Sequence, residues 1–175
     1  GDDRALFNGV NRTLDNDDVS TFKSGFGVAK FTNFKTDGSA GHDAKFPDAD
    51  FFLMRAAEAY LNFAEADARI NGGQTTKEGT EAINAIRKRA NASPREDKGY
   101  SLNDICDEWS REFYFEGRRR MDLIRFNRFG GNVNYNWQWK GGTKEGRNFS
   151  KDLNIFAIPT NELTSNKNLI QNPGY

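Results

Sequence analysis

Apolar residues recur at helical spacing in the middle of the chain, between residues 51 and 70. The stretch FFLMRAAEAYLNFAEADARI places leucine, tyrosine and several alanines every three or four positions, with charged residues between them. This spacing gathers the apolar side chains on one face of a helix, and alanines on that face let another helix approach closely. Asn71, Gly72 and Gly73 then provide the backbone freedom that ends a helix. The pattern therefore predicts a packed helix over 51–70.

A second helix is predicted to begin at Thr75. The Thr75 hydroxyl would accept a backbone N–H while Glu78 reaches back, which is the reciprocal capping box. The buried face of this helix is expected to contain Ala82, Ile83, Ile86 and Ala90. Because the turn before it is short, the two helices should form an antiparallel hairpin of the size found in tetratricopeptide-type repeats.

Two more helical segments are expected after a polar loop. Ser101 should cap a third helix, with Asp104 three residues on and with Ile105, Trp109 and Phe113 facing inward. A glycine interrupts the pattern, and a fourth helical segment is predicted from about residue 118 to residue 126. The middle of the chain should therefore contain two helix hairpins.

The rest of the chain lacks a long periodic pattern. Residues 1–50 are rich in Asp, Asn, Gly and Thr and contain one strand-like run, whereas residues 130–151 are rich in glycine, asparagine and aromatic side chains. One short strand is expected at 154–158. The prediction is a mainly α fold of tetratricopeptide-like hairpins with a loop-rich remainder and a few short strands. We expect a single unit over residues 1–175, with a loop-rich lead-in at 1–50, a helical core at 51–127, and a loop and tail at 128–175.

The composition narrows the classes of partner and cofactor. The chain has 25 basic and 25 acidic residues, so net charge gives no drive toward nucleic acid or an anionic membrane. A single cysteine, Cys106, forms no internal disulfide, and a single histidine, His42, argues against a histidine-based zinc site. We expect no metal and no cofactor. The first residues lack a signal-peptide pattern and no stretch of about 18 apolar residues occurs, so this chain is expected to be soluble.

The segment FEGRRRMDLIRF at 115–126 combines fixed charge with apolar residues. On a helix, Arg118 would lie one turn before Asp122, which is pairing distance. The arginines could form an anion pocket or a structural ion-pair network, and the acids of the same segment favour the network because they can neutralise the arginines. The predicted network consists of Arg111, Glu112, Glu116, Arg118, Asp122 and Arg125.

Carboxylates of the helical segments could also act as catalytic groups. Glycoside hydrolysis needs two acids that face one cleft, one of them with a raised pKa. Glu58, Glu65, Glu112 and Glu116 each have a basic residue within one to four positions, which favours ionised structural partners. No Ser, His or Cys arrangement suggests a nucleophile. We therefore predict that the protein is not an enzyme and has no catalytic residues.

The loop NYNWQWKGG contains the best candidate for ligand binding. Tyr135, Trp137 and Trp139 alternate, so in an extended segment the three rings would point the same way. Flat rings can stack on the C–H face of a sugar while neighbouring Asn, Gln and Lys side chains bond its hydroxyls. The same alternation is also typical of the buried face of a strand that covers helices. Both interpretations predict a shared direction for the rings.

Several motifs together resemble those of a known family. The segments RAAEAYLNFAEA, INAIRKRA, EWSREFYFEGRRRMDLIRF, IFAIPTNEL and NKNLIQNPGY occur in this order along the chain. They resemble the carboxyl-terminal part of SusD/RagB-type proteins, and the resemblance extends from about Gly25 to Tyr175. The EFYFEGRRRMDLIR block and the closing QNPGY are the most specific parts of the match.

The resemblance implies a fold and a function. It implies a mostly helical, non-enzymatic protein that binds oligosaccharide at the cell outer membrane of Gram-negative bacteria and delivers it to a TonB-dependent transporter of the SusC type. The full-length form would be surface-exposed and lipid-anchored. A tetratricopeptide-type scaffold for protein interaction is the alternative. A groove with exposed aromatic rings at 135–139 would favour sugar, whereas a flat apolar face above about 400 Å² would favour protein.

Overall fold

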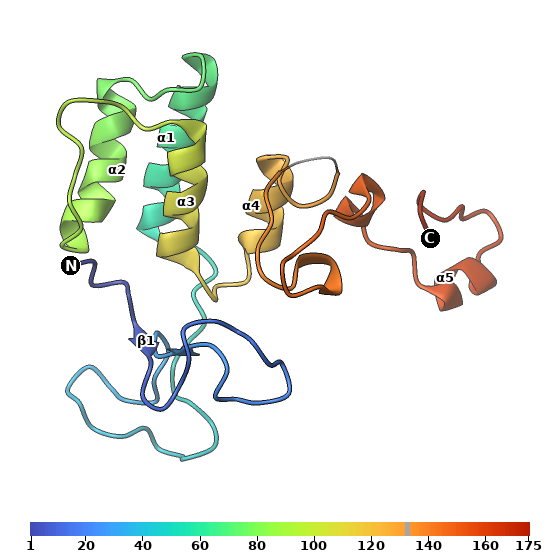
Figure 1. The fold of residues 1–175 in the computed structure, drawn as a ribbon, viewed down its shortest axis with the longest axis horizontal. Helices are drawn as coiled ribbons and strands as arrows, with labels where there is room; N and C mark the ends of the chain where they lie inside the picture. The colour runs from blue at the N-terminus through green and yellow to red at the C-terminus, as the bar shows by residue number, and fades with distance from the viewer. Residues whose placement is uncertain (132–133) are drawn as a thin grey trace. The chain divides into compact units, whose positions relative to one another are not determined.

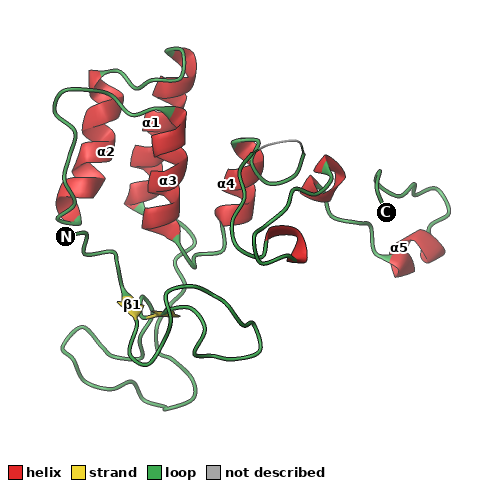
Figure 2. Ribbon diagram, viewed as in Figure 1, coloured by secondary structure: helices red, strands yellow, loops and turns green. Residues whose placement is uncertain are grey.

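A computed structural model describes residues 1–131 and 134–175. The chain forms two compact units, residues 1–112 and residues 113–175, and each is described by itself. In the described residues the regular structure is mainly helical, with only short strands (Figures 1 and 2), so the predicted fold class is confirmed. The expectation that residues 1–175 form a single unit stays a prediction.

The helices follow the predicted order along the chain. The α-helices are α1 (Ala56–Ile70), α2 (Lys77–Arg89), α3 (Leu102–Phe113), α4 (Arg119–Arg125) and α5 (Thr160–Ser165), and the 3-10 helices are η1 (Lys140–Gly142) and η2 (Lys151–Asn154). Strands β1 (Phe7–Asn8) and β2 (Gly27–Val28) pair antiparallel, with Phe7 opposite Val28. The first predicted helix begins later than expected, because residues 51–54 are exposed and not helical.

Helices α1, α2 and α3 lie side by side and enclose the core of the first unit (Figure 1). Alanines and leucine of α1 face isoleucines of α2 and the fully buried Trp109 of α3, and burying these apolar side chains drives the packing. The Trp109 indole N–H donates to Glu65 Oε2 at 2.9 Å, and the other Glu65 oxygen accepts from Arg69 at 2.8 Å. Both Glu65 carboxylate oxygens and the Trp109 indole N–H are therefore paired inside this helical layer.

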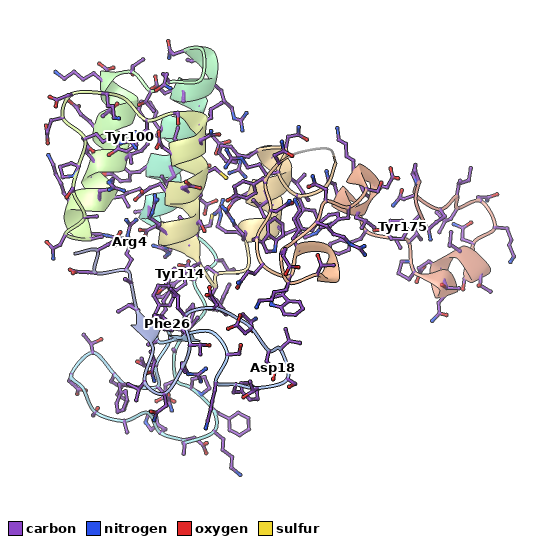
Figure 3. All side chains as sticks on the ribbon, viewed as in Figure 1. Arg4, Asp18, Phe26, Tyr100, Tyr114 and Tyr175 are labelled. Carbon is purple, nitrogen blue, oxygen red and sulfur yellow. The ribbon has the colours of Figure 1, made fainter. Side chains whose placement is uncertain are left out.

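The predicted N-cap of α2 is wrong by one residue. Thr76 is the cap, and its hydroxyl accepts from the Gly79 N–H at 3.5 Å. Thr75 is buried instead, and its hydroxyl oxygen accepts from the Tyr100 N–H at 2.8 Å. Local spacing assigned the Thr75 hydroxyl to the N-terminus of α2. In the structure this hydroxyl instead makes a tertiary contact with the segment before α3. Figure 3 shows Tyr100 beside α2, where its hydroxyl donates to Asn84 Oδ1 at 2.7 Å.

The predicted cap of α3 is confirmed. The Ser101 hydroxyl accepts from the Asp104 N–H at 3.2 Å, and an Asp104 carboxylate oxygen accepts from the Ser101 N–H at 2.9 Å. Arg95 adds a two-point ion pair to Asp104, at 2.9 and 2.6 Å. The Arg95 guanidinium therefore holds the pKa of the Asp104 carboxyl well below its usual range, although burial acts in the opposite direction.

The predicted strand at 154–158 is wrong. Residues 151–154 form η2, and residues 156–159 carry no regular structure. The Ile158 N–H donates to Gln171 Oε1 at 2.8 Å, and Gln171 Nε2 donates back to the Ile158 carbonyl at 2.9 Å. A side-chain amide thus satisfies the backbone groups that a neighbouring strand would otherwise pair.

The segment before α1 consists mostly of turns around the β1–β2 pair. Large apolar side chains along it are exposed, with Phe22 92% and Leu53 87% accessible. None of the helices in the described part of the chain combines the length and the apolar character needed to cross a membrane. Within residues 1–131 and 134–175, no group of His, Cys, Asp and Glu side chains is arranged to hold a metal ion.

Replacing Thr75 by valine should destabilise the helical layer. Valine has the same shape but leaves the buried Tyr100 N–H without its acceptor, which costs about 1 to 3 kcal/mol. Urea unfolding, followed by circular dichroism, measures the loss. The exposed Thr164→Val variant is the control. Equal stability of the two variants would show that the Thr75 hydroxyl has no part in joining α2 to α3.

Candidate functional site

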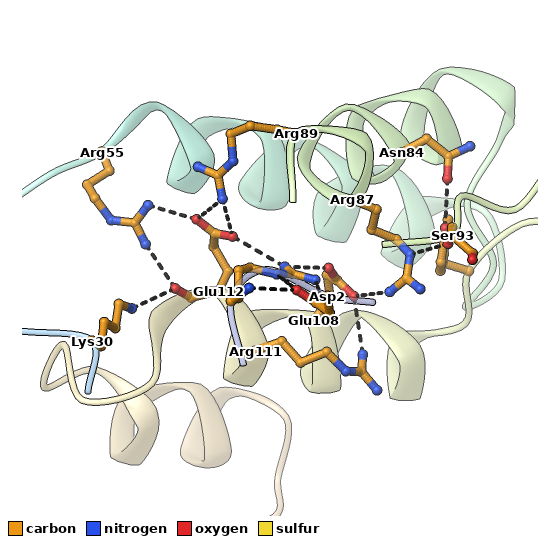
Figure 4. A network of polar contacts seen from close by, with 12 residues as sticks. Asp2, Lys30, Arg55, Asn84, Arg87, Arg89, Ser93, Glu108, Arg111 and Glu112 are labelled. Atoms are coloured by element: carbon orange, nitrogen blue, oxygen red, sulfur yellow. Dashed lines mark hydrogen bonds and ion pairs between the residues drawn. The ribbon is translucent and has the colours of Figure 1, made fainter. Parts of the chain in front are cut away.

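Two regions contain the residues predicted to be functional, one in each compact unit. The first is a charged cluster around Glu108 and Glu112, which lie one turn apart on α3 (Figure 4). Both residues are buried, with 1% and 3% of their surface exposed. Because an ionised carboxylate is rarely buried without partners, its neighbours decide what this cluster can do.

Glu108 is bonded by three arginines. One carboxylate oxygen accepts from Arg4 Nη1 at 2.7 Å, and the other accepts from Arg87 Nη1 at 2.7 Å. Arg111, one turn along α3, adds a contact at 3.2 Å. Arg4 continues to Asp2 at 2.7 Å, so the start of the chain is tied to α2 and α3 through this carboxylate.

Four positively charged side chains bond to Glu112. Its carboxylate accepts from Arg89 at 2.7 Å, from Arg55 at 2.8 Å and from Arg4 at 3.2 Å. Its backbone carbonyl accepts from Arg55 Nη2 at 3.0 Å and from Lys30 Nζ at 3.0 Å. The contacts marked in Figure 4 thus join the lead-in segment, the start of α1 and the end of α2 to one turn of α3.

The electrostatics of this cluster favour the ionised forms of Glu112 and Asp2. Burial acts to raise the pKa of Glu112, but the hydrogen bonds from Arg55 and Arg89 outweigh burial and hold the pKa below its ordinary value. The Arg4 guanidinium lowers the pKa of Asp2 from 3.8 to about 2. A general acid needs the opposite shift, so this geometry suits structural ion pairs.

The structure divides the predicted ion-pair residues between the two units. Arg111 pairs with Glu108, and Glu112 pairs with arginines from distant segments, as described above. In the second unit, buried Asp122 lies 3.6 Å from Arg118 Nε and 3.0 Å from Arg125 Nη2. Glu116 is half-buried just before α4. The helical spacing thus identified Arg118 as a neighbour of Asp122, and it did not identify the arginines that bond Glu112. The structural role of the set stays a prediction.

The second region is the aromatic loop, defined here as residues 134–149. The rings of Tyr135 and Trp137 meet edge to face, with centroids 6.3 Å apart. Phe129 stacks on Trp137 at 6.4 Å with an interplanar angle of 24°. The Tyr135 hydroxyl accepts from Arg119 Nη2 at 2.7 Å, and Trp137 remains 37% exposed. These two rings therefore form a supported aromatic surface.

Trp139 departs from the expected alternation. Its backbone is left-handed, with φ of 66°, and its N–H donates to the Lys144 carbonyl at 3.2 Å. Gly141 continues the turn with φ of 65°, and a side chain there would meet Arg147 at 2.8 Å. The chain turns back at this point, so the three rings do not share one extended segment. Their role in binding ligand stays a prediction.

Lys140 is the residue of this loop that the sequence analysis missed. It is 1% exposed, and its Nζ donates to the Tyr135 carbonyl at 2.6 Å and to Asn148 Oδ1 at 2.9 Å. The same ammonium lies 4.8 Å from the Trp137 ring centroid and 5.6 Å from that of Phe149, within range of cation–π attraction. Burial lowers the pKa of Lys140. This single cation organises the carbonyls and rings of the loop from inside.

The helical fold is shared with solved structures of SusD-like proteins. A SusD superfamily protein from Parabacteroides distasonis superposes with a TM-score of 0.63 at 20% identity, covering 100% of this chain and 39% of that chain. Surface glycan-binding protein A from Bacteroides thetaiotaomicron, in complex with laminarihexaose, gives a TM-score of 0.53 at 25% identity and covers 70% of this chain and 24% of that chain.

Sequence comparison identifies the family. The profile described as SusD family matches residues 2–175, so the chain belongs to the SusD family, as the motifs indicated. It is 43% identical over 179 residues to the starch-binding protein SusD of Bacteroides thetaiotaomicron. The alignment covers 100% of this chain and 31% of that relative, so the chain spans about a third of the relative's length.

Replacing Glu112 by glutamine should destabilise the first unit by about 3 to 5 kcal/mol, because its arginine partners would stay desolvated without their counter-charge. Chemical denaturation at neutral pH measures the loss. Since the pKa of Glu112 is lowered in the folded state, its contribution is present above the unfolded pKa of about 4.3 and is lost as pH falls through the lower folded value.

The difference between wild type and Glu112→Gln should therefore shrink at acid pH. The exposed Glu96→Gln variant is the control and should unfold like wild type at every pH. A Glu112→Gln variant as stable as wild type at neutral pH would argue against a structural role for the cluster and in favour of an anion pocket.

Replacing Lys140 by methionine should loosen the aromatic loop. The Tyr135 carbonyl and the Asn148 amide would lose their buried donor, at a cost of about 1 to 3 kcal/mol. We expect a red-shifted tryptophan emission and faster chymotrypsin cleavage between residues 135 and 139. The exposed Lys167→Met variant provides the control. Unchanged emission and cleavage would mean that the ammonium does not organise the loop.

Proposed function

We propose that this chain takes part in non-catalytic binding of oligosaccharide at the cell surface. The observation that carries the proposal is its 43% identity, along its whole length, to a relative named as a starch-binding protein. A solved structure of a glycan-binding protein in complex with laminarihexaose, at 25% identity, supports the same class of ligand. Both relatives are longer than this chain. Oligosaccharide binding by the chain itself is therefore a proposal, and the titration below tests it.

The aromatic loop is the proposed contact surface. Trp137 is 37% exposed and is supported by Phe129 and Tyr135, so the ring is held in place before a ligand arrives. A preorganised ring loses little conformational freedom when the C–H face of a sugar stacks on it. Asn136 and Gln138 are exposed on either side of Trp137 and carry amides that can bond sugar hydroxyls. Trp139 belongs to the turn that shapes this surface.

A binding role without catalysis is proposed because the buried carboxylates are paired with arginine. Glu108, Glu112 and Asp122 each lie within 3.2 Å of at least one guanidinium nitrogen. Hydrogen bonds from Arg55 and Arg89 hold the pKa of Glu112 below its ordinary value, whereas protonation of a glycosidic oxygen needs a carboxyl with a raised pKa. The chemistry of these acids supports fold stability over hydrolysis.

The wider proposal follows from family membership. We propose that the full-length protein is lipid-anchored at the outer membrane, exposed at the surface, and delivers its ligand to a TonB-dependent transporter of the SusC type. A tetratricopeptide-type protein-interaction scaffold is the second candidate, and the antiparallel α1–α2 hairpin is the observation that favours it. Helix packing alone accounts for the alanine stripe of that hairpin, so sugar binding is preferred.

Calorimetric titration of the chain with maltohexaose and laminarihexaose tests the proposal. Trp137→Ala should weaken binding by about 1 to 3 kcal/mol, as truncation of a central contact ring does, and should leave the melting temperature nearly unchanged. Trp137→Phe keeps a ring and should bind more tightly than Trp137→Ala. Trp139→Ala should mainly lower stability, because Trp139 is half-buried within the turn.

Two outcomes would contradict this assignment. If the folded wild-type chain binds neither sugar, this chain does not bind oligosaccharide by itself, and the proposal is wrong. Binding that is insensitive to Trp137→Ala would place the ligand away from the aromatic loop.

A further inference from the structure

A pocket of about 450 Å³ opens in the groove between α1 and α2. Its volume falls in the range of small-ligand sites, about 300 to 1,000 Å³. The lining residues come from both helices and differ from those of the charged cluster and the aromatic loop. They are Ala59, Tyr60, Phe63, Glu78, Glu81 and Ala82.

The α1 side of the pocket is aromatic. Tyr60 and Phe63 lie one turn apart and therefore share a face of the helix. They are 47% and 53% exposed, because the core stripe of α1 consists of small residues and leucine and the two rings lie outside it. Exposed aromatic rings can take the C–H face of a pyranose or attract a cation.

The α2 side of the pocket is acidic. Glu78 and Glu81 are also one turn apart and share a face. Hydrogen bonds from its own backbone N–H and from the Thr76 hydroxyl hold the pKa of Glu78 below its ordinary value. The Thr76 oxygen lies 3.0 Å from Glu78 Oε2. Glu81 has an exposed partner, Lys77, at 3.9 Å, which offsets little of its charge.

We propose that this pocket binds a sugar residue that carries a protonated amine, such as glucosamine within an oligosaccharide. The inference rests on the proposed carbohydrate-binding function and adds a second, charge-selective subsite to it. The apolar face of the sugar ring packs against Tyr60 and Phe63, and its ammonium donates to Glu78 and Glu81. Charge complementarity favours the amino sugar over a neutral one, because Glu78 and Glu81 line the pocket together with the two rings, and the exposed Lys77, 3.9 Å from Glu81, offsets little of their charge.

Titration of the 175-residue chain with two oligosaccharides tests the proposal. The probes are a β-1,4-linked glucosamine hexamer and the N-acetylglucosamine hexamer of the same linkage, which lacks the charge. We expect at least about tenfold tighter binding of the amine form, with a preference that declines as salt screens the carboxylates. The Glu78→Gln/Glu81→Gln variant should lose that preference. Phe63→Ala should weaken binding about two- to fivefold.

Matched controls separate this pocket from general charge attraction. The Glu96→Gln/Asp97→Asn variant makes the same change in net charge at exposed positions outside the pocket and should keep the preference. Melting curves establish that every variant is folded, which is expected because Glu78, Glu81 and Phe63 are exposed.

Three results would overturn the proposal. These are equal affinity for the two hexamers, an equal loss in the two charge-changing double variants, or competition by a trilysine peptide as strong as by the glucosamine hexamer. The last would show recognition of an amine without the sugar. Maltohexaose and laminarihexaose titrations of the same samples report on the aromatic loop, so loss of the amine preference is distinguishable from failure of the carbohydrate function.

Discussion

The first unit depends on the need of two buried carboxylates for positive charge. Glu108 and Glu112 are desolvated on α3, and a carboxylate in that position destabilises the fold unless cations surround it. Arginines from three other segments meet this need, with Arg4 before β1, Arg55 before α1, and Arg87 near the end of α2. One requirement thus joins the start of the chain, the segment before α1 and the end of α2 to one turn of α3, so the charges of the cluster have an architectural role.

Because those charges are paired, recognition is proposed for two surfaces outside the cluster. The aromatic loop presents Trp137 above a buried ammonium, Lys140, that bonds backbone and amide oxygens. The groove between α1 and α2 presents rings beside carboxylates. The two surfaces differ in the sign of their nearest charge, so they suit different sugars.

Helix positions were predictable because the forces that set them are local. Periodic apolar residues marked α1, α2 and α3, and the Ser101–Asp104 cap of α3 formed as its spacing indicated. The predictions that were wrong concern positions where a group distant in the sequence replaced the expected local partner. Tyr100 engages the hydroxyl of Thr75 and leaves Thr76 to cap α2, and Gln171 pairs with Ile158 where a strand was expected.

The sequence by itself determined the family and the mainly helical class, and its spacing placed Arg118 one turn before Asp122, where the two side chains lie 3.6 Å apart. These follow from motif order and from the 3.6-residue period of the helix. Only the tertiary structure decided the partners of Glu112, which lie 108, 57 and 23 positions away at Arg4, Arg55 and Arg89. It also decided the burial of Lys140 and the turn at Trp139. The physical reason is that desolvation and long-range pairing depend on which segments pack together, and no spacing along the chain encodes that.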